Sequence, residues 1–215
     1  MSSMKFLVAD DHYITRMGVK FLLKEIFPNS KIEEAKDADE VLKQVRSLDF
    51  DLIILDLNMP KTNGVDLIGR ILRLKPEVKI LVLSMNNESI YSTKAIEEGA
   101  KGFVSKEEDM GKLKDAISKV LSDRIYLSDS VINTLIERKQ TKNYTENPFS
   151  ILSSKELEIA RLIYEGKSLK DMLALLKKSQ STISTQKANI FSKLGVETQN
   201  EFLDMARLYK LSEFA

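Results

Sequence analysis

Three acidic side chains directly follow two of the most apolar segments of the chain. Leu52–Leu55 is followed by Asp56, and Lys5–Ala9 is followed by Asp10 and Asp11. Short runs of Leu, Ile and Val are typical of strands that are covered on both faces of a parallel sheet. Such sheets bind ligands beyond the carboxyl ends of their strands. The three carboxylates are therefore expected at one edge of a sheet.

Two further strand-like segments end in groups of other kinds. Lys79–Leu83 is followed by the hydroxyl of Ser84, and Gly102–Val104 is followed by Ser105 and the ammonium group of Lys106. Each polar residue also has a plainer interpretation, because an acid can cap the next helix and a lysine can be a solvated surface charge. Their convergence on one edge favours a binding site.

The expected site has the groups needed for phosphoryl transfer. Carboxylates this close repel one another unless a cation lies among them. Oxygen ligands alone predict Mg²⁺, which keeps several waters and joins a few carboxylates to a phosphate. An aspartate beside Mg²⁺, here Asp56, can attack a phosphoryl donor and form an acyl phosphate. Lys106 and Ser84 would then hold the new phosphoryl oxygens by charge and hydrogen bond.

The elements that position these groups form an α/β pattern. Five strands alternate with five helices, which predicts a flavodoxin-like, doubly wound, five-stranded parallel sheet. A capping box at Asp37 and Glu40 is expected to open the second helix, and Gly99 to close the fourth. The second strand is expected at Lys31–Ala35, and the helices at Tyr13–Phe27, Ala38–Leu48, Val65–Leu74, Ser89–Glu98 and Met110–Leu121.

Length and composition set outer limits on the class of protein. The 215 residues are 43% hydrophobic and 30% charged, which fits a soluble chain with one large or two ordinary domains. There is no cysteine and only one histidine, which excludes disulfides and clustered imidazole ligands. No apolar run approaches the ~20 residues that span a bilayer, and the N-terminus reaches acids too early for a signal peptide. A cytoplasmic location and no membrane partner are expected.

The order and spacing of the motifs resemble a bacterial response-regulator receiver domain over residues 4–122. The motifs are Asp10-Asp11, Asp56-x-Asn58-Met59-Pro60-x-x-x-Gly64, Ser84 and Lys106. The resemblance implies that Asp56 is the phospho-acceptor. It also implies that Asp11, Asp56 and the backbone carbonyl of Asn58 hold Mg²⁺, with Asp10 acting through water. Ser84 and Phe103 resemble a switch pair, and Lys106 resembles the phosphoryl-binding lysine.

Three residues near these motifs are not expected to react with the phosphoryl group or to bind the cation. Lys106 is followed by Glu107, where many receivers have proline. His12 is expected to have a structural or supporting role, because a phosphohistidine would need a dimerising helical context. Arg16 is expected to pack on the first helix near the edge of the sheet.

The last part of the chain reads as a linker followed by a small all-α domain. Arg124–Glu137 predicts one short helix, and Lys139–Pro148 is polar and reads as a tether. The expected limits are 1–123 for the receiver, 124–148 for the linker and 149–215 for a four-helix domain. Caps and glycines predict its helices at Ser154–Glu165, Leu169–Leu176, Gln180–Leu194 and Gln199–Leu211.

The third of these helices has one apolar and one small polar face. Helical periodicity places Ile183, Ile190 and Leu194 on one stripe. The opposite face carries Ser184, Thr185, Ala188 and Ser192, small residues that would let a backbone approach base edges. An ordinary amphipathic helix with a solvent face is the alternative interpretation.

The pattern of caps and apolar residues over residues 150–210 resembles a LuxR-type helix-turn-helix. A receiver joined to this module is the architecture of NarL/FixJ-type two-component response regulators. The resemblance places Ser181, Ser184, Thr185, Lys187 and Ala188 on the DNA face. Many members have Asn at the place of Leu169, a basic residue at that of Ser184 and His at that of Gln186.

A helix with so few basic residues is expected to bind DNA weakly as a monomer and to need a second half-site. The last helix resembles the dimerisation helix of the family, and packing on its own domain is the alternative. The residues concerned are Phe202, Met205, Leu208 and Tyr209.

The function expected from these patterns is a response regulator with no dedicated enzyme activity. Its expected partners are a sensor histidine kinase, promoter DNA and a second copy of itself when active. A protein-binding output module is the alternative. The lack of a basic residue at Ser184 favours this alternative, whereas the lysines between Lys167 and Lys193 oppose it. A Mg²⁺-dependent phosphatase would need a second aspartate two residues after the nucleophile, where the chain has Asn58.

Overall fold

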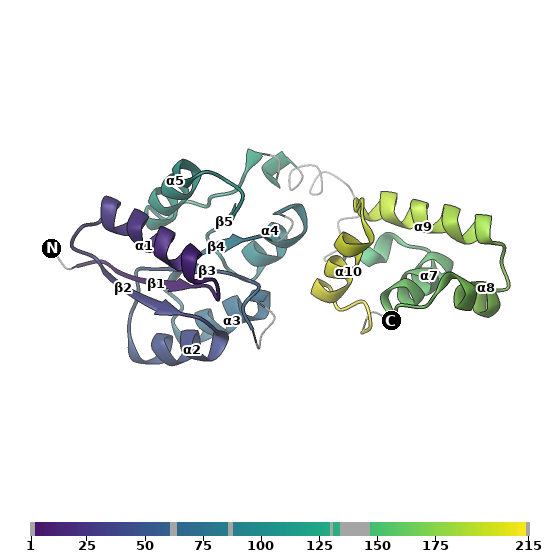
Figure 1. The fold of residues 1–215 in the computed structure, drawn as a ribbon, viewed down its shortest axis with the longest axis horizontal. Coiled ribbons are helices and arrows are strands. Elements are labelled where there is room, and N and C mark those ends of the chain that lie inside the picture. Colours follow the sequence, from purple (N-terminus) through teal and green to yellow (C-terminus); the bar gives the residue numbers. More distant parts are fainter. Residues whose placement is uncertain (1–2, 61–63, 86–87, 130, 134–146, 214–215) are drawn as a thin grey trace. The chain divides into compact units, whose positions relative to one another are not determined.

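The chain forms two compact units, Met1–Lys139 and Gln140–Ala215. The computed structural model describes residues 3–60, 64–85, 88–129, 131–133 and 147–213. Figure 1 shows an α/β arrangement in the first unit and only helices in the second. This is the predicted fold class.

The first unit is built on a five-stranded parallel sheet with the order β2-β1-β3-β4-β5. The strands are β1 (Lys5–Ala9), β2 (Lys31–Ala35), β3 (Leu52–Leu55), β4 (Lys79–Ser84) and β5 (Gly102–Ser105). The first three have the predicted limits. β4 and β5 each extend one residue further, so that Ser84 and Ser105 are the last residues of their strands. The chain leaves β1 toward one side and β3 toward the other, which makes the ends of β1 and β3 the switch point of the sheet.

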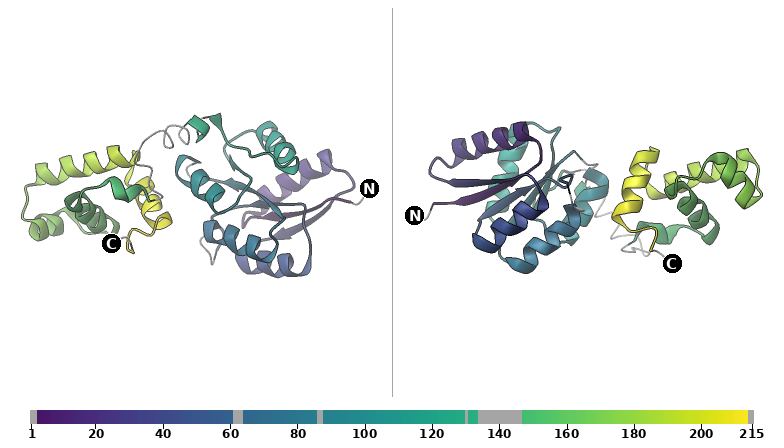
Figure 2. Two further views of the ribbon diagram at one scale, coloured as in Figure 1. Left: turned by 180° about the vertical axis from the view of Figure 1, so that it is seen from behind. Right: turned by 60° about the horizontal axis from the view of Figure 1, so that its bottom comes forward.

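Five helices cover the two faces of the sheet. They are α1 (Tyr13–Ile26), α2 (Ala38–Ser47), α3 (Gly64–Leu74), α4 (Glu88–Glu97) and α5 (Met110–Leu121). Figures 1 and 2 show α1 and α5 on one face, with α2 and α3 on the other. The face under α1 and α5 is a continuous apolar core that includes Leu23, Leu52 and Ile117.

The burial pattern of the strands explains their place in the sheet. All four residues of β3 are buried, as expected for a central strand with helices on both sides. The edge strand β2 carries Lys31, Glu33 and Glu34, and such charges discourage pairing with another chain. The side chain of Asp37 caps α2 through the backbone N–H of Glu40, whereas the Glu40 carboxylate accepts from the N–H of Lys36. Gly99 has a φ of 105° just after α4, as its predicted role requires.

The segment after α5 is partly attached to the sheet. The backbone N–H of Phe103 donates to the carbonyl of Tyr126, and the N–H of Tyr126 donates to the carbonyl of Lys101. The segment from Arg124, which was predicted to be a linker, therefore begins as an extension beside β5. Residues 131–133 are helical, and the predicted tether lies outside the described residues as far as residue 146.

The described residues of the second unit, 147–213, form a short 3₁₀ helix and four α-helices. They are η1 (Pro148–Ile151), α7 (Ser154–Tyr164), α8 (Leu169–Leu176), α9 (Gln180–Leu194) and α10 (Gln199–Leu208). Serine or threonine caps each α-helix: Ser153, Ser168, Ser179 and Thr198 accept from the backbone N–H three residues later. Within the parts of the chain that are described, no helix is both long and apolar enough to cross a membrane.

The core of this unit is organised around Phe202 of α10. Its ring stacks on Phe191 with centroids 5.3 Å apart, and it meets the edge of Phe149 at 6.2 Å. Phe149 and Phe202 are fully buried. Pro148, which was predicted to end the tether, therefore starts an element that is packed into the second unit.

The last helix is shorter than its pattern predicts. α10 ends at Leu208, whereas the apolar spacing continues to Leu211. Lys210 has a φ of 51°, and the N–H of Leu211 donates back to the carbonyl of Ala206. This closure stops the helix while it buries Leu211, so the apolar pattern continues beyond the helix itself.

We expect the charge of Glu156 to stabilise the second unit fully above pH 4.5 and progressively less as the pH falls toward and below 2. The hydrogen bond from Lys193 and the backbone hydrogen bond from Ser153 lower the pKa of Glu156 to about 2. Because the pKa is lowered by folding, the stabilisation is complete above the unfolded pKa and is lost as the pH falls through the folded one. Glu156→Gln should cost about 1 kcal/mol at pH 7 and clearly less at pH 2, where about half of the folded carboxylates are protonated.

Hydrogen exchange of the buried amides of Ile159 and Ile163 in the full chain measures this difference. Glu158→Gln, on an exposed position of the same helix, is the matched control and should leave exchange unchanged at both pH values. Equal protection in Glu156→Gln and the native chain at pH 7 would contradict the prediction.

Candidate functional site

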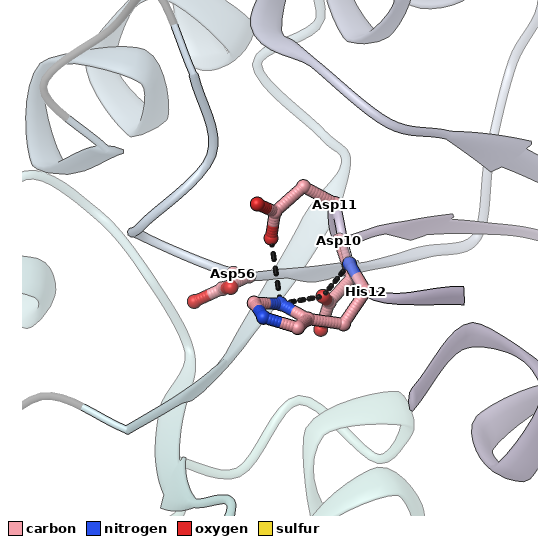
Figure 3. A group of neighbouring side chains, drawn as sticks. All are labelled: Asp10, Asp11, His12 and Asp56. Atoms are coloured by element: carbon pink, nitrogen blue, oxygen red, sulfur yellow. Dashed lines mark hydrogen bonds and ion pairs between the residues drawn. The ribbon is translucent and has the colours of Figure 1, made fainter. Parts of the chain in front are cut away.

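Three carboxylates meet at the switch point between β1 and β3, as the sequence predicted. Asp10 and Asp11 follow β1, and Asp56 follows β3. One ligand atom from each, together with a ring nitrogen of His12, lies within 4.8 Å of the others. Figure 3 shows these side chains converging from the two strand ends. Asp10 and Asp56 are buried, whereas Asp11 and His12 are exposed, so the cluster opens to solvent on one side.

Lys106 lies between the two buried acids. Its Nζ is 2.7 Å from Oδ2 of Asp10 and 2.7 Å from Oδ2 of Asp56, and its side chain is 10% exposed. The hydroxyl of Ser84 donates to Oδ1 of Asp56 at 3.1 Å. The ends of three strands, β3, β4 and β5, thus place a hydroxyl and an ammonium group directly against one buried carboxylate.

The electrostatics of the cluster leave room for a further cation. Burial acts to lower the pKa of Lys106, but its hydrogen bonds to Asp10 and Asp56 outweigh burial and raise that pKa above its ordinary value. Lys106 is therefore charged at neutral pH. One ammonium group thus lies among three carboxyl groups, an arrangement consistent with a metal site. Oxygen donors from Asp10, Asp11 and Asp56 suit a hard cation such as Mg²⁺.

The loop after Asp56 is held to the Asp56 carboxylate by a hydrogen bond from its own backbone. The N–H of Asn58 donates to Oδ1 of Asp56 at 3.1 Å. Gly64 begins α3 so close to this loop that a Cβ built on it would lie 2.2 Å from the carbonyl oxygen of Leu57. Only glycine fits there without moving the loop. Phe103, the other predicted switch residue, is fully buried in β5.

Two residues take part in the site more closely than the sequence indicated. Nδ1 of His12 lies 2.8 Å from Oδ1 of Asp11 and 3.3 Å from Oδ1 of Asp10. Nη1 of Arg16 donates to the carbonyl oxygens of Asp10 at 2.8 Å and Asp11 at 3.2 Å. The signal for Arg16 was its place one helical turn after His12, which puts its side chain back over the turn.

In the second unit, four of the five predicted DNA-facing residues share one face of α9, whereas Lys187 lies toward the buried stripe of the helix. Ser181, Ser184, Thr185 and Ala188 are exposed, and Lys187 is partly buried. Ile183, Ile190 and Leu194 are buried on the opposite side, as periodicity predicted. Lys177, in the left-handed conformation, starts the short turn between α8 and α9. These two helices form the predicted helix-turn-helix arrangement.

The lysines near α9 have partners within the domain. Lys187 donates to the side chain of Gln199 at 2.8 Å and lies over the ring of Phe191. Lys178 donates to Gln186 at 2.9 Å. Lys193 pairs with Glu156 at 2.8 Å. The exposed face of α9 is therefore built from small polar groups rather than from unpaired charges.

Most residues predicted for dimerisation lie in the core of their own unit. Phe202 is 0% exposed, Met205 3% and Leu208 7%. Side chains buried in this way have the packing role that the sequence left as the alternative. Tyr209 is partly exposed, so a dimer through α10 would use Tyr209 and the exposed polar residues of the helix. Dimerisation through α10 stays a prediction.

Comparison with known protein families agrees with this geometry. A family model described as "Response regulator receiver domain" matches residues 6–118. A second, described as "Bacterial regulatory proteins, luxR family", matches residues 150–206.

Relatives and solved structures match along the whole chain. The Fimbriae Z protein of Salmonella typhimurium is 33% identical over 215 residues, 98% of this chain and 100% of the relative. The oxygen regulatory protein NreC of Staphylococcus epidermidis is 33% identical over 218 residues, 98% and 100%. RcsB from Salmonella enterica serovar Typhimurium, solved with promoter P1flhDC and the phosphomimetic BeF₃⁻, has a TM-score of 0.77 at 28% identity, covering 96% of this chain and 99% of that one.

These matches cover both units, and the receiver match includes the strand-end acids, Ser84 and Lys106. They place the chain among signalling regulators of transcription rather than among dedicated enzymes. The chain belongs to the NarL/FixJ-type two-component response regulators, which join a receiver domain to a LuxR-type helix-turn-helix.

Proposed function

We propose that this regulator is phosphorylated on Asp56 and that phosphorylation controls the binding of promoter DNA by its second unit. The observation that carries the first step is the contact of Asp56 with both Lys106 and Ser84 at the switch point of the sheet. A buried carboxylate with an ammonium group and a hydroxyl already in place is prepared to receive a phosphoryl group. The donor is a phosphohistidine of a sensor kinase, as in the family.

The transfer assigns a role to each side chain. A carboxylate oxygen of Asp56 forms a bond to phosphorus while the bond from phosphorus to the donor's leaving group breaks. The Lys106 ammonium group, now held by two carboxylates, contributes charge-assisted hydrogen bonds to the phosphoryl oxygens. The Ser84 hydroxyl turns its hydrogen bond from Asp56 toward the same oxygens, with Phe103 buried behind it as the second member of the switch pair.

The proposed cofactor is Mg²⁺. Asp11, Asp56 and the backbone carbonyl of Asn58 would hold it directly, and Asp10 through water. When bound, Mg²⁺ offsets the negative charge of the incoming phosphoryl group. The excess of carboxylates over ammonium groups in the cluster supports a divalent ion at this place.

For the whole chain we propose a receiver at 1–123, a connecting segment at 124–148 and an output domain at 149–215. DNA binding by the output domain is supported by its LuxR-family match and by the small, exposed face of α9. Ser181, Ser184, Thr185, Lys187 and Ala188 would contact the DNA. Because that face has little charge, a phosphorylation-dependent homodimer would supply the second half-site. Such a protein works in the cytoplasm, where promoter DNA and the kinase domain lie.

The test is selection of fragments of the source genome with and without acetyl phosphate, followed by gel shifts of the selected DNA. We expect Ser184→Asp to weaken binding at least tenfold, because a lost base contact is worth about 1–3 kcal/mol and the acid also repels phosphate. The affinity should fall with salt with a log–log slope of about 0.9 for each phosphate contacted.

Ser154→Asp is the matched control, since it adds the same charge at an exposed position at the start of α7. It should leave the affinity unchanged. No enrichment of any fragment by the phosphorylated chain would contradict DNA binding.

A protein-binding output is the second candidate. The observation that favours it is that Lys178, Lys187 and Lys193 each contact a side chain of their own unit. If the genomic selection fails, this candidate predicts that Ser184→Asp changes the binding of a protein partner instead.

A further inference from the structure

The turn between β1 and α1 presents Asp10 and Asp11 to the cation site. Few hydrogen bonds within the turn itself hold these two residues in place. Only His12 separates Asp11 from the first residue of α1, and His12 makes no side-chain hydrogen bond as the helix cap. Oδ1 of Asp10 accepts from the N–H of His12, which orients Asp10 but not Asp11. The Asp11 carboxylate contacts Nδ1 of His12 at 2.8 Å, but the His12 side chain is itself 69% exposed and is not fixed by packing.

Arg16 supplies the missing support. Its Nη1 bonds the carbonyl oxygens of Asp10 and Asp11 together, at 2.8 and 3.2 Å. Among the described residues, no other side chain is seen bonded to the carbonyl of Asp11. The backbone N–H of Arg16 also donates to the carbonyl of His12 at 3.2 Å. One residue of α1 thus contacts the backbone of all three residues of the turn.

Arg16 is itself fixed in place. Its Nε donates to Oε2 of Glu34 on the neighbouring strand β2 at 3.0 Å, and its side chain is only 13% exposed. Its guanidinium lies 5.7 Å from the ring centroid of Tyr13. Glu34 is held in turn by Lys20, and its backbone carbonyl accepts from Gln44 at 2.6 Å. Contacts with α1 and β2, and the support of β2 by Gln44 of α2, therefore determine where the guanidinium lies.

Glu34 also solves an electrostatic problem. A guanidinium beside a cation site would repel the cation, and the carboxylate of Glu34 offsets that charge. The hydrogen bond from Lys20 and the bond from Arg16 lower the pKa of Glu34, against an opposing effect of burial. Glu34 is thus ionised at neutral pH and can balance Arg16.

We infer that Arg16 is a positioning residue for the cation site, which holds the Asp10–Asp11 turn so that the carboxylate of Asp11 is preorganised toward the bound ion. The inference rests on the proposed function of the acid cluster. Arg16 does not touch the phosphoryl group, so its loss should weaken Mg²⁺ binding without removing the capacity for transfer. Such supporting residues typically contribute a factor of about 10 to 100 to metal affinity.

The experiment uses the full chain with Arg16→Met, Arg16→Lys and, as control, Lys24→Met. Lys24→Met removes an exposed positive charge from the same helix, where its ammonium group bonds the carbonyl of Ser30, and leaves Arg16, Lys20 and Glu34 unchanged. Binding of Mg²⁺ alone is followed by chemical shifts of the amides of the turn. The initial rate of labelling by acetyl phosphate is then measured across Mg²⁺ concentrations.

For Arg16→Met we expect at least about tenfold weaker Mg²⁺ binding, with the maximal labelling rate recovered at saturating Mg²⁺. Arg16→Lys, which can reach a single carbonyl, should lie between Arg16→Met and the native chain. Lys24→Met should bind Mg²⁺ as the native chain does. A merely structural role would instead lower the thermal stability of Arg16→Met while leaving its Mg²⁺ affinity unchanged.

Native affinity in Arg16→Met, or a rate that saturating Mg²⁺ does not restore, overturns the inference. If Arg16→Met does not fold, the affinity of Arg16→Lys decides in the same way. A native chain that binds Mg²⁺ but is never labelled would overturn the proposed function and leave the Arg16 result standing. A native chain that does not bind Mg²⁺ overturns the inference.

Discussion

Asp56→Asn is expected to abolish labelling of the chain by acetyl phosphate in the presence of Mg²⁺. Asparagine keeps the shape of the side chain, but its amide is not a nucleophile and cannot form an acyl phosphate. The substitution also removes the negative charge that holds Lys106 at 2.7 Å. Incorporation of radioactive phosphate, followed by cleavage with hydroxylamine to identify an acyl phosphate, measures the effect.

Asp66→Asn provides the matched control. Asp66 is an exposed acid in the first turn of α3, only ten residues further along the chain. Its replacement should leave labelling intact. Undiminished labelling of Asp56→Asn, or a phosphate that resists hydroxylamine, would show that another residue is the acceptor.

The second large effect is expected for Lys106→Met in buffer without divalent cations. Asp10 and Asp56 have side chains that are 3% and 1% exposed. Without the ammonium group, these two buried carboxylates face each other unpaired. Removal of one partner from a buried ion pair typically costs about 3–5 kcal/mol. Urea unfolding should show a loss of this size, and added Mg²⁺ should recover more stability in the variant than in the native chain.

Lys75→Met tests whether the loss of any ion-paired lysine would destabilise the chain to the same extent. Lys75 pairs with Asp49 at the other end of the sheet, where the Asp49 side chain is 83% exposed. Solvent screens such a pair, so the urea midpoint should barely move. A Lys106→Met variant as stable as the native chain in metal-free buffer would mean that the acids of the cluster do not depend on Lys106.

The acidic cluster and its neighbours at the strand ends could be predicted well, because each residue is marked by the short sequence segment in which it lies. Each of Asp56, Ser84 and Lys106 ends or directly follows an apolar run, and a parallel sheet brings all strand ends to one edge. Strand order then follows from a small set of allowed connections. Residues far apart in sequence are joined by this topology without any knowledge of side-chain packing.

The support of the site could not be predicted in the same way. The role of Arg16 depends on the rotation of α1 about its axis and on Glu34 of β2 lying beside it. The spacing places Arg16 one helical turn after His12, but it encodes neither of these two features. Tyr126 beside β5 is a similar case, since its pairing uses backbone groups that any residue would offer.

Amphipathic helices carry a further ambiguity. The apolar side of α10 predicts burial but does not say against what, and Phe202, Met205 and Leu208 turn out to be buried within their own unit. A surface that pairs with a second copy and one that packs internally have the same periodicity. The exposed face of α9 has the same limitation, because small polar residues suit water as well as DNA.

The aromatic contacts at the start of the output domain have a mechanical consequence. Phe149 is among the innermost side chains of that domain, yet it lies two residues from Asn147, where the described chain resumes. The first described turn of the output domain is thus anchored in its hydrophobic core by one side chain. A displacement of Phe149 would disturb the ring of Phe202 and, through it, the stacked ring of Phe191 in α9. A fragment of the output domain that begins after Phe149 would lack one of the fully buried side chains of the domain's core.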